Sequence, residues 1–114
     1  MKNIVTIGVA SLDEVKDRLA AAFCGEPQGN HISFLTVEQM WKTLNPKRTQ
    51  ILRAMTGQGP MSIREVARRV GRDVKAVHGD VQALLKAGVL DREGKGVVFP
   101  YDGVRVDFTL GMAA

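Results

Sequence analysis

The sequence predicts a small α+β protein, and three observations support this class. β-Branched residues cluster near the start, apolar residues recur at helical spacing through the middle, and alternation with a period of two follows Gly88. A chain of 114 residues can bury one cooperative core but is marginal for two. We expect a strand-helix extension at 1–33, which is a candidate dimerisation element, and a main domain at 34–114.

The extension is expected to form a strand, a helix and a loop. Residues 3–9 alternate as a strand does, with Val5, Ile7 and Val9 on one face. Ser11 begins the helix, because SLDE is a capping box in which the serine oxygen accepts a backbone N–H bond. This helix carries an apolar stripe formed by Leu12, Val15, Leu19, Ala22 and Phe23. Two glycines, a proline and an asparagine then indicate a loop over 25–30, and HISFL predicts a short strand.

Two helices are expected next. The first is capped by Thr36 in TVEQ, and we place its Met40 and Trp41 in the core. The second starts at Asn45-Pro46, because asparagine is a good N-cap and proline suits the first helical turn. Its buried residues are expected to be Ile51, Leu52 and Met55.

Residues 62–88 predict two further helices joined by a tight turn. Ser62 and Glu65 form another capping box, and Gly71 suits the end of that helix because it tolerates positive φ. Asp73 caps the next helix, expected over 74–87, and Gly88 ends it. Its inward residues are expected to be Val74, Val77, Val81, Leu84 and Leu85. Two short helices with a turn of about three residues match the helix-turn-helix plan.

The residues after Gly88 predict strands. VLDRE, GKG and VVFPY indicate a β-hairpin with a cationic tip. VRVDFTL then alternates, with Val104, Val106, Phe108 and Leu110 on one face. Three helices followed by a hairpin are the order of a winged helix-turn-helix, so we predict that fold with an N-terminal strand-helix extension.

The positive charge is concentrated in the middle of the chain. Residues 47–92 hold ten Lys or Arg against four Asp or Glu, a net charge of +6, whereas 1–46 and 93–114 each carry −1. A localised excess of this kind favours a polyanionic partner, although a solvated basic surface is the plainer alternative. In a helix-turn-helix the second helix enters the major groove, so we expect residues 74–87 to bind double-stranded DNA there.

Individual roles follow from helical geometry. Lys75, Gly79, Gln82 and Lys86 share the outward face of the predicted helix. Lysine can reach guanine, glutamine can reach adenine, and Ala76 can contact a thymine methyl. Arginines one turn apart, and those in the turn and the hairpin, are suited to phosphates. The predicted DNA-contacting set is Ser62, Arg64, Arg68, Arg72, Lys75, Ala76, His78, Gly79, Gln82, Arg92 and Lys95.

Three residues of the basic region have interpretations other than direct contact with DNA. Gly79 costs roughly 1 kcal/mol of helix stability relative to alanine, which indicates either close approach of DNA, or tight packing against protein, or neutral drift. Arg69 is expected to pair with Glu65 four residues earlier. Asp80 is expected to orient a neighbouring cation.

No pattern of a catalytic centre is present in the sequence. Cys24 is the only cysteine, and His31 and His78 lack metal-ligand spacing. There is no phosphate-binding glycine loop and no nucleophile with a base. We therefore expect no enzyme activity, no cofactor and no metal. The run IVTIGVA is too short to span a bilayer, so we expect a cytoplasmic protein with no membrane partner.

Three runs, LNPKRTQILRAM, MSIREVARRVGRDVKAVHGDVQALLKAGVL and VVFPYDGVRVDF, resemble a family of small prokaryotic winged-helix proteins. These are predicted DNA-binding regulators, loosely related to the MarR type. The resemblance implies a transcription regulator that binds DNA as a homodimer. Members are often encoded beside a small toxin gene, which implies an antitoxin role as the alternative. Gly79 departs from the basic or larger residue that many relatives have there.

The predicted function is sequence-specific DNA binding for transcriptional control, in the form of autoregulation. The alternative is an antitoxin or interaction module that neutralises a small partner protein. For the homodimer, we expect contacts from the exposed edge of the strand at 3–9 and from the helix after it, so that deletion of 1–25 weakens it.

Overall fold

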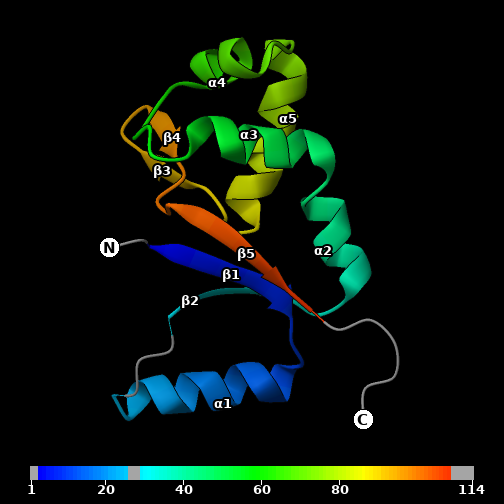
Figure 1. The fold of residues 1–114 in the computed structure, drawn as a ribbon, viewed down its shortest axis with the longest axis vertical. Coiled ribbons are helices and arrows are strands. Elements are labelled where there is room, and N and C mark those ends of the chain that lie inside the picture. Colours follow the sequence, from blue (N-terminus) through cyan, green and yellow to red (C-terminus); the bar gives the residue numbers. More distant parts are fainter. Residues whose placement is uncertain (1–2, 26–28, 109–114) are drawn as a thin grey trace.

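The structure is a computed structural model that describes residues 3–25 and 29–108. In chain order its elements are β1 (Ile4–Val9), α1 (Leu12–Phe23), β2 (Asn30–Phe34), α2 (Val37–Thr43), α3 (Pro46–Met55), α4 (Ile63–Val70), α5 (Val74–Lys86), β3 (Asp91–Glu93), β4 (Gly96–Val98) and β5 (Gly103–Asp107). This arrangement confirms the predicted α+β class (Figure 1). No helix in the described ranges is long and apolar enough to cross a membrane.

The first and last strands of the described chain, β1 and β5, pair in a three-stranded parallel sheet of order β2-β1-β5. Val5 of β1 is opposite Asn30 of β2 on one side and Val104 of β5 on the other. The predicted exposed edge of the 3–9 strand is therefore wrong, because β1 is the central strand and both its edges are paired. The predicted division at 33/34 falls near the end of β2, and β5 joins the strands of the extension in one sheet.

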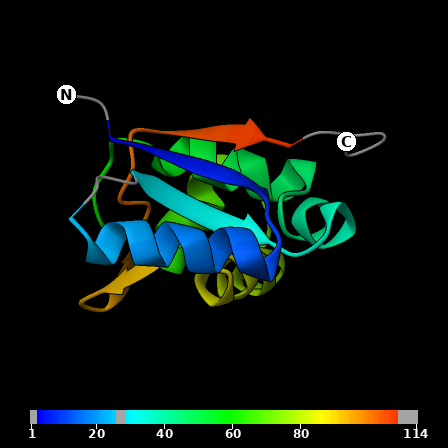
Figure 2. The ribbon, with the colours of Figure 1, turned by 90° about the horizontal axis from the view of Figure 1, so that it is seen from below.

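The two faces of this sheet have different neighbours. Helices α2 to α5 lie on one side, whereas α1 lies on the other (Figures 1 and 2). Val5 and Ile7 are fully buried and join the core together with Met40, Ile51 and other residues of the helices. The alternation predicted for β1 is thus confirmed, since its apolar face is the one that meets the helical side.

Helix α1 begins where predicted but buries none of its residues. The Ser11 hydroxyl accepts a hydrogen bond from the Glu14 backbone N–H at 3.1 Å. In the apolar stripe, Leu12 is 63% exposed, Leu19 is 61% exposed and Phe23 is 95% exposed. Among the described residues, a hydrogen bond from Arg18 Nη1 to Ser33 Oγ at 3.1 Å joins α1 to the sheet. The apolar stripe of α1 is therefore left on the surface.

The predicted helix starts of the main domain are confirmed by their caps. The side chains of Thr36, Asn45 and Ser62 each accept a hydrogen bond from the backbone N–H three residues later. Asp73 occupies the N-cap of α5, but its side chain makes no capping hydrogen bond. Local sequence thus places these helix ends, because capping is a contact between near neighbours.

Two predicted core positions are wrong. Trp41 is 49% exposed, and its ring stands edge-on to Phe108 with centroids 5.3 Å apart. Val74 is 43% exposed because it lies in the first turn of α5, before the helix reaches the core. The other inward residues predicted for α5 are buried or half-buried: Val77, Val81, Leu84 and Leu85.

The predicted hairpin is formed by antiparallel strands β3 and β4, with Arg92 opposite Val97. Gly94 in its turn has φ of +60°, which glycine adopts without strain. An isolated bridge joins Met61 to Val97 and ties the hairpin to the segment before α4. The predicted strand at the C-terminal end is confirmed as β5, while Leu110 lies outside the described residues.

Candidate nucleic-acid interface

Residues 62–88, here called the basic segment, fold into α4, a three-residue turn and α5. Gly71 ends α4 with φ of +67°, in the left-handed region. The backbone N–H of Arg72 then bonds the Ala67 carbonyl at 3.1 Å, which closes the turn. Val66 and Ala67 of α4 and Val77 and Val81 of α5 are all buried in one core cluster. This packing leaves the opposite face of α5 to solvent.

The solvent face of α5 carries most of the residues expected to read bases. Lys75, Ala76, His78 and Gly79 are exposed, and Gln82 is half-buried. Within the described ranges, Lys75 makes no ion pair. The structure therefore brings these five predicted residues together on one accessible helix face.

Gly79 lies in open space on this face. A Cβ added to it would meet no atom within 4 Å among the described residues, and its φ is not positive. Tight packing against another element of this chain, one of the alternatives from the sequence, is thus wrong. Close approach of a ligand and neutral drift remain.

Asp80 fixes the orientation of α5 through two arginines. Its Oδ1 accepts from Arg48 Nε at 3.0 Å and its Oδ2 accepts from Arg72 Nη2 at 2.7 Å. Arg48 also donates from Nη1 to the carbonyl of Lys42 at 2.9 Å. The carboxylate thereby links α5 to α3 and to the turn after α4, and the prediction that Asp80 orients a cation is confirmed.

This cluster is largely shielded from water. The side chains of Arg48, Arg72 and Asp80 are 20%, 18% and 14% exposed. Burial works against ionisation of Asp80, but the hydrogen bonds from Arg72 and Arg48 outweigh it, so the pKa of Asp80 lies below its ordinary value. Arg72, which was expected to contact a phosphate, is engaged inward by Asp80 in this structure. Sequence reasoning did not assign Arg48 to this cluster, because its partner is 32 residues away.

Glu65 holds two further arginines on the surface of α4. Arg68 Nε donates to Glu65 Oε1 at 2.9 Å, and Arg69 Nε donates to Oε2 at 2.8 Å. The predicted Arg69 pair is thus confirmed. The hydrogen bond from Arg68, and to a smaller extent that from Arg69, stabilises the Glu65 carboxylate and lowers its pKa to about 2. Arg68 remains 72% exposed although it is paired.

The other cations of the predicted DNA-contacting set lie at the start of α4 and on the hairpin. Arg64 is exposed one position after the start of α4, and Ser62 caps that helix. Arg92 Nη2 donates to Gln82 Oε1 at 3.3 Å, which joins the hairpin to α5. Lys95 is exposed in the hairpin turn. The predicted residues of α5 and the hairpin are therefore in contact, although no sequence pattern indicated that pair.

Within the described ranges, no three His, Cys, Asp or Glu side chains are grouped so that they could hold a metal ion. What the segment offers is a helix face with donors and acceptors, a rigid support beneath it and cations on either side.

Comparison with known proteins finds one family. A family model described as HVO_A0114 matches residues 43–106, from the end of α2 into β5. No curated protein and no solved structure matches the chain. The matched range includes the whole basic segment and the hairpin, and it excludes β1, α1 and β2.

Proposed function

The chain belongs to the HVO_A0114 family, and we propose that it is a sequence-specific, double-stranded DNA-binding regulator with a winged helix-turn-helix. In this proposal α4 and α5 are the two helices of the motif, and the β3–β4 hairpin is the wing. The observation that carries it is the outward face of α5, which is exposed, holds Lys75 and Gln82, and has a buried apolar face behind it.

The proposed binding mode places α5 in the major groove. There the residues after the N-terminus of the second helix reach base edges, while the first helix crosses the backbone. Lys75 would donate to guanine O6 or N7, Gln82 would pair with adenine, and Ala76 would meet a thymine methyl. The Asp80 cluster supports this mode, because it holds α5 against α3 and the turn.

Phosphate contacts are proposed for the flanking cations. Arg64 and Lys95 are exposed and make no ion pair within the described ranges. Arg68 could exchange Glu65 for a phosphate, since most of its side chain is in water. We assign Arg72 to the support of α5 instead of to phosphate, on the basis of its bond to Asp80. Such contacts position a protein on the duplex without reading its sequence.

The test is binding of the purified protein to the DNA upstream of its own coding sequence, measured by fluorescence anisotropy beside a shuffled duplex over a salt series. Preference for the upstream DNA, with a salt slope that implies several phosphate contacts, would support an operator-binding regulator and autoregulation. Weak and equal binding to both duplexes would contradict it.

Lys75→Ala is the variant that tests the assigned face. We expect a loss of about 1 to 3 kcal/mol in binding and a relaxed preference at one base position. Lys16→Ala, on α1 at the far side of the sheet, is the matched control and should bind as the parent does. If Lys75→Ala binds as tightly and as selectively as the parent, α5 does not read DNA through this face.

A second candidate function is neutralisation of a small partner protein, such as a toxin. The observation that favours it is the apolar stripe on α1, where Leu12, Leu19 and Phe23 are exposed. Leu19→Ser together with Phe23→Ser should then abolish binding of that partner while DNA binding persists, and the two functions can coexist.

A further inference from the structure

β5 is a strand with one free edge. Its only neighbour in the described part of the chain is β1, because the sheet order is β2-β1-β5. In Figure 2 β5 is the outermost strand on its side of the sheet. An open edge presents unpaired backbone N–H and C=O groups, which favour pairing with another strand.

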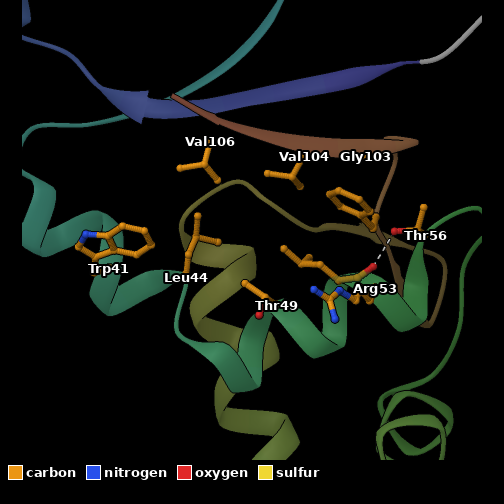
Figure 3. A pocket seen from close by; sticks show the side chains of 10 residues that line it. Trp41, Leu44, Thr49, Arg53, Thr56, Gly103, Val104 and Val106 are labelled. Carbon is orange, nitrogen blue, oxygen red and sulfur yellow. Dashed lines mark hydrogen bonds between the residues drawn. The ribbon is translucent and has the colours of Figure 1, made fainter. Parts of the chain in front are cut away.

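An apolar groove lies beside this edge, between α3 and the helix-facing side of β5 (Figure 3). Its volume is about 330 Å³, and its apolar walls include Trp41, Leu44, Leu52, Val104 and Val106. Val106 is 44% exposed and Trp41 is 49% exposed. Half-exposed large side chains along a free edge leave apolar area for a partner to cover.

The sequence of β5 is complementary to itself in one register. When a strand pairs antiparallel with its own copy about a two-fold axis, the register is centred on one residue, since opposed side chains must face the same side. Centring on Arg105 would oppose two arginines, and centring on Asp107 would oppose two aspartates. Centring on Val106 opposes Arg105 of each copy to Asp107 of the other, which is the favourable arrangement.

We propose that two copies of this chain dimerise through β5, antiparallel, about a two-fold axis at Val106. The two sheets then form one continuous six-stranded sheet. Val106 meets its own copy and Val104 meets Phe108 of the other copy on the side of the groove, while the two Arg105–Asp107 pairs form on the opposite face. Backbone pairing, apolar contact and charge thus agree in a single register.

This dimer also places the basic segments of both copies on one side of the joined sheet. A two-fold axis perpendicular to a sheet keeps each face on its own side, so α4 and α5 of both copies lie on the same side of the joined sheet. All of the helices α2 to α5 are on that side in each copy (Figures 1 and 2). The dimer does not depend on the proposed DNA binding. It is argued from β5 alone, and it can be measured with protein alone.

The first measurement is the mass of the full chain by light scattering over a concentration series, without DNA. We expect a dimer. Arg105→Asp opposes two aspartates twice, and Asp107→Arg opposes two arginines twice, so each variant should dimerise about tenfold more weakly or worse. Lys95→Asp makes the same charge change on the hairpin as Arg105→Asp and should leave the mass of the dimer unchanged.

Mixing the two variants gives the decisive result. Arg105→Asp in one copy and Asp107→Arg in the other restore both opposite-charge pairs, so an equimolar mixture should form a heterodimer. The chain that carries both substitutions should dimerise as the parent does. Because a dimer can form again only from folded chains, these two results show that the single variants lose the interface and do not fail to fold.

Two outcomes would overturn the proposal. One is a parent protein that stays monomeric throughout the series. The other is a parent dimer that persists in both single variants, which would place the contact elsewhere, such as the exposed stripe of α1. Failure of DNA binding with an intact charge-dependent dimer would contradict the proposed function alone.

Discussion

The open surroundings of Gly79 narrow the reasons for a glycine at this position of α5. Its place on the exposed face of α5 gives no reason for a glycine within the part of the chain that the structure describes, since an added Cβ would meet open space there. A glycine within a helix is destabilising because it loses more backbone freedom on folding than alanine does. Either a ligand comes close enough to exclude a side chain, or the position has drifted.

Gly79→Ala distinguishes these readings. We expect the free energy of unfolding to rise by roughly 1 kcal/mol, because the substitution adds helix propensity without a clash. If DNA approaches closely, the same variant should bind its operator more weakly. Urea denaturation and fluorescence anisotropy measure the two effects. A variant that is more stable and binds DNA unchanged would favour drift.

Among the elements, α5 depends on the Asp80 cluster for its position. Two arginines from outside the helix converge on one carboxylate, and all three side chains are mostly buried. Removing one charge of such a group leaves the others uncompensated, which is costlier than losing a surface pair. The cluster therefore links the stability of the domain to the orientation of its proposed recognition helix.

Asp80→Asn should cost about 3 kcal/mol of stability. Asp73→Asn is the matched control, since the Asp73 side chain makes no capping bond and asparagine caps as well as aspartate. Urea denaturation of both variants at neutral pH measures the difference. Equal stability of the two would show that the Asp80 ion pairs contribute nothing.

The pH dependence has a defined sign. The pKa of Asp80 is lower in the folded protein than its ordinary value of 3.8. Its contribution to stability is therefore fully present above that value and is lost as the pH falls through the depressed pKa. In Asp80→Asn, this part of the acid sensitivity should disappear.

At the scale of the whole molecule, the N-terminal extension is part of the sheet and not a separable attachment. β1 is the central strand, with β2 on one edge and β5 on the other. Val5 and Ile7 of β1 are fully buried in the shared core. The proposed dimer edge on β5 is held in place by β1, so the extension supports an interface that it does not itself form.

Deletion of residues 1–25 should consequently destabilise the whole sheet, and not merely weaken a dimer as the sequence suggested. The removal takes out β1 and α1 and leaves β2 and β5 without the strand between them. Circular dichroism and urea denaturation of the truncated chain should show loss of strand content and a lower free energy of unfolding. A truncated chain as stable as the parent would contradict this account.

The sequence by itself determined the local features of this protein. The starts of α2, α3 and α4 could be predicted from Thr36, Asn45 and Ser62, because a cap contacts a backbone group three residues away. The hairpin and the Glu65–Arg69 pair were predictable for the same reason. So was the exposed face of α5, since helical periodicity separates its two sides.

Only the tertiary structure decided which distant residues meet. A period of two shows that a strand has an apolar face, but it does not identify the neighbouring strand, so the pairing of β1 with β5 across the chain was not predictable. For the same reason Arg72 was assigned to phosphate, whereas it binds Asp80, and Trp41 was placed in the core, whereas it lies half-exposed beside Phe108. The partner of a charged or aromatic side chain depends on how the elements pack, and that is set by the whole core at once.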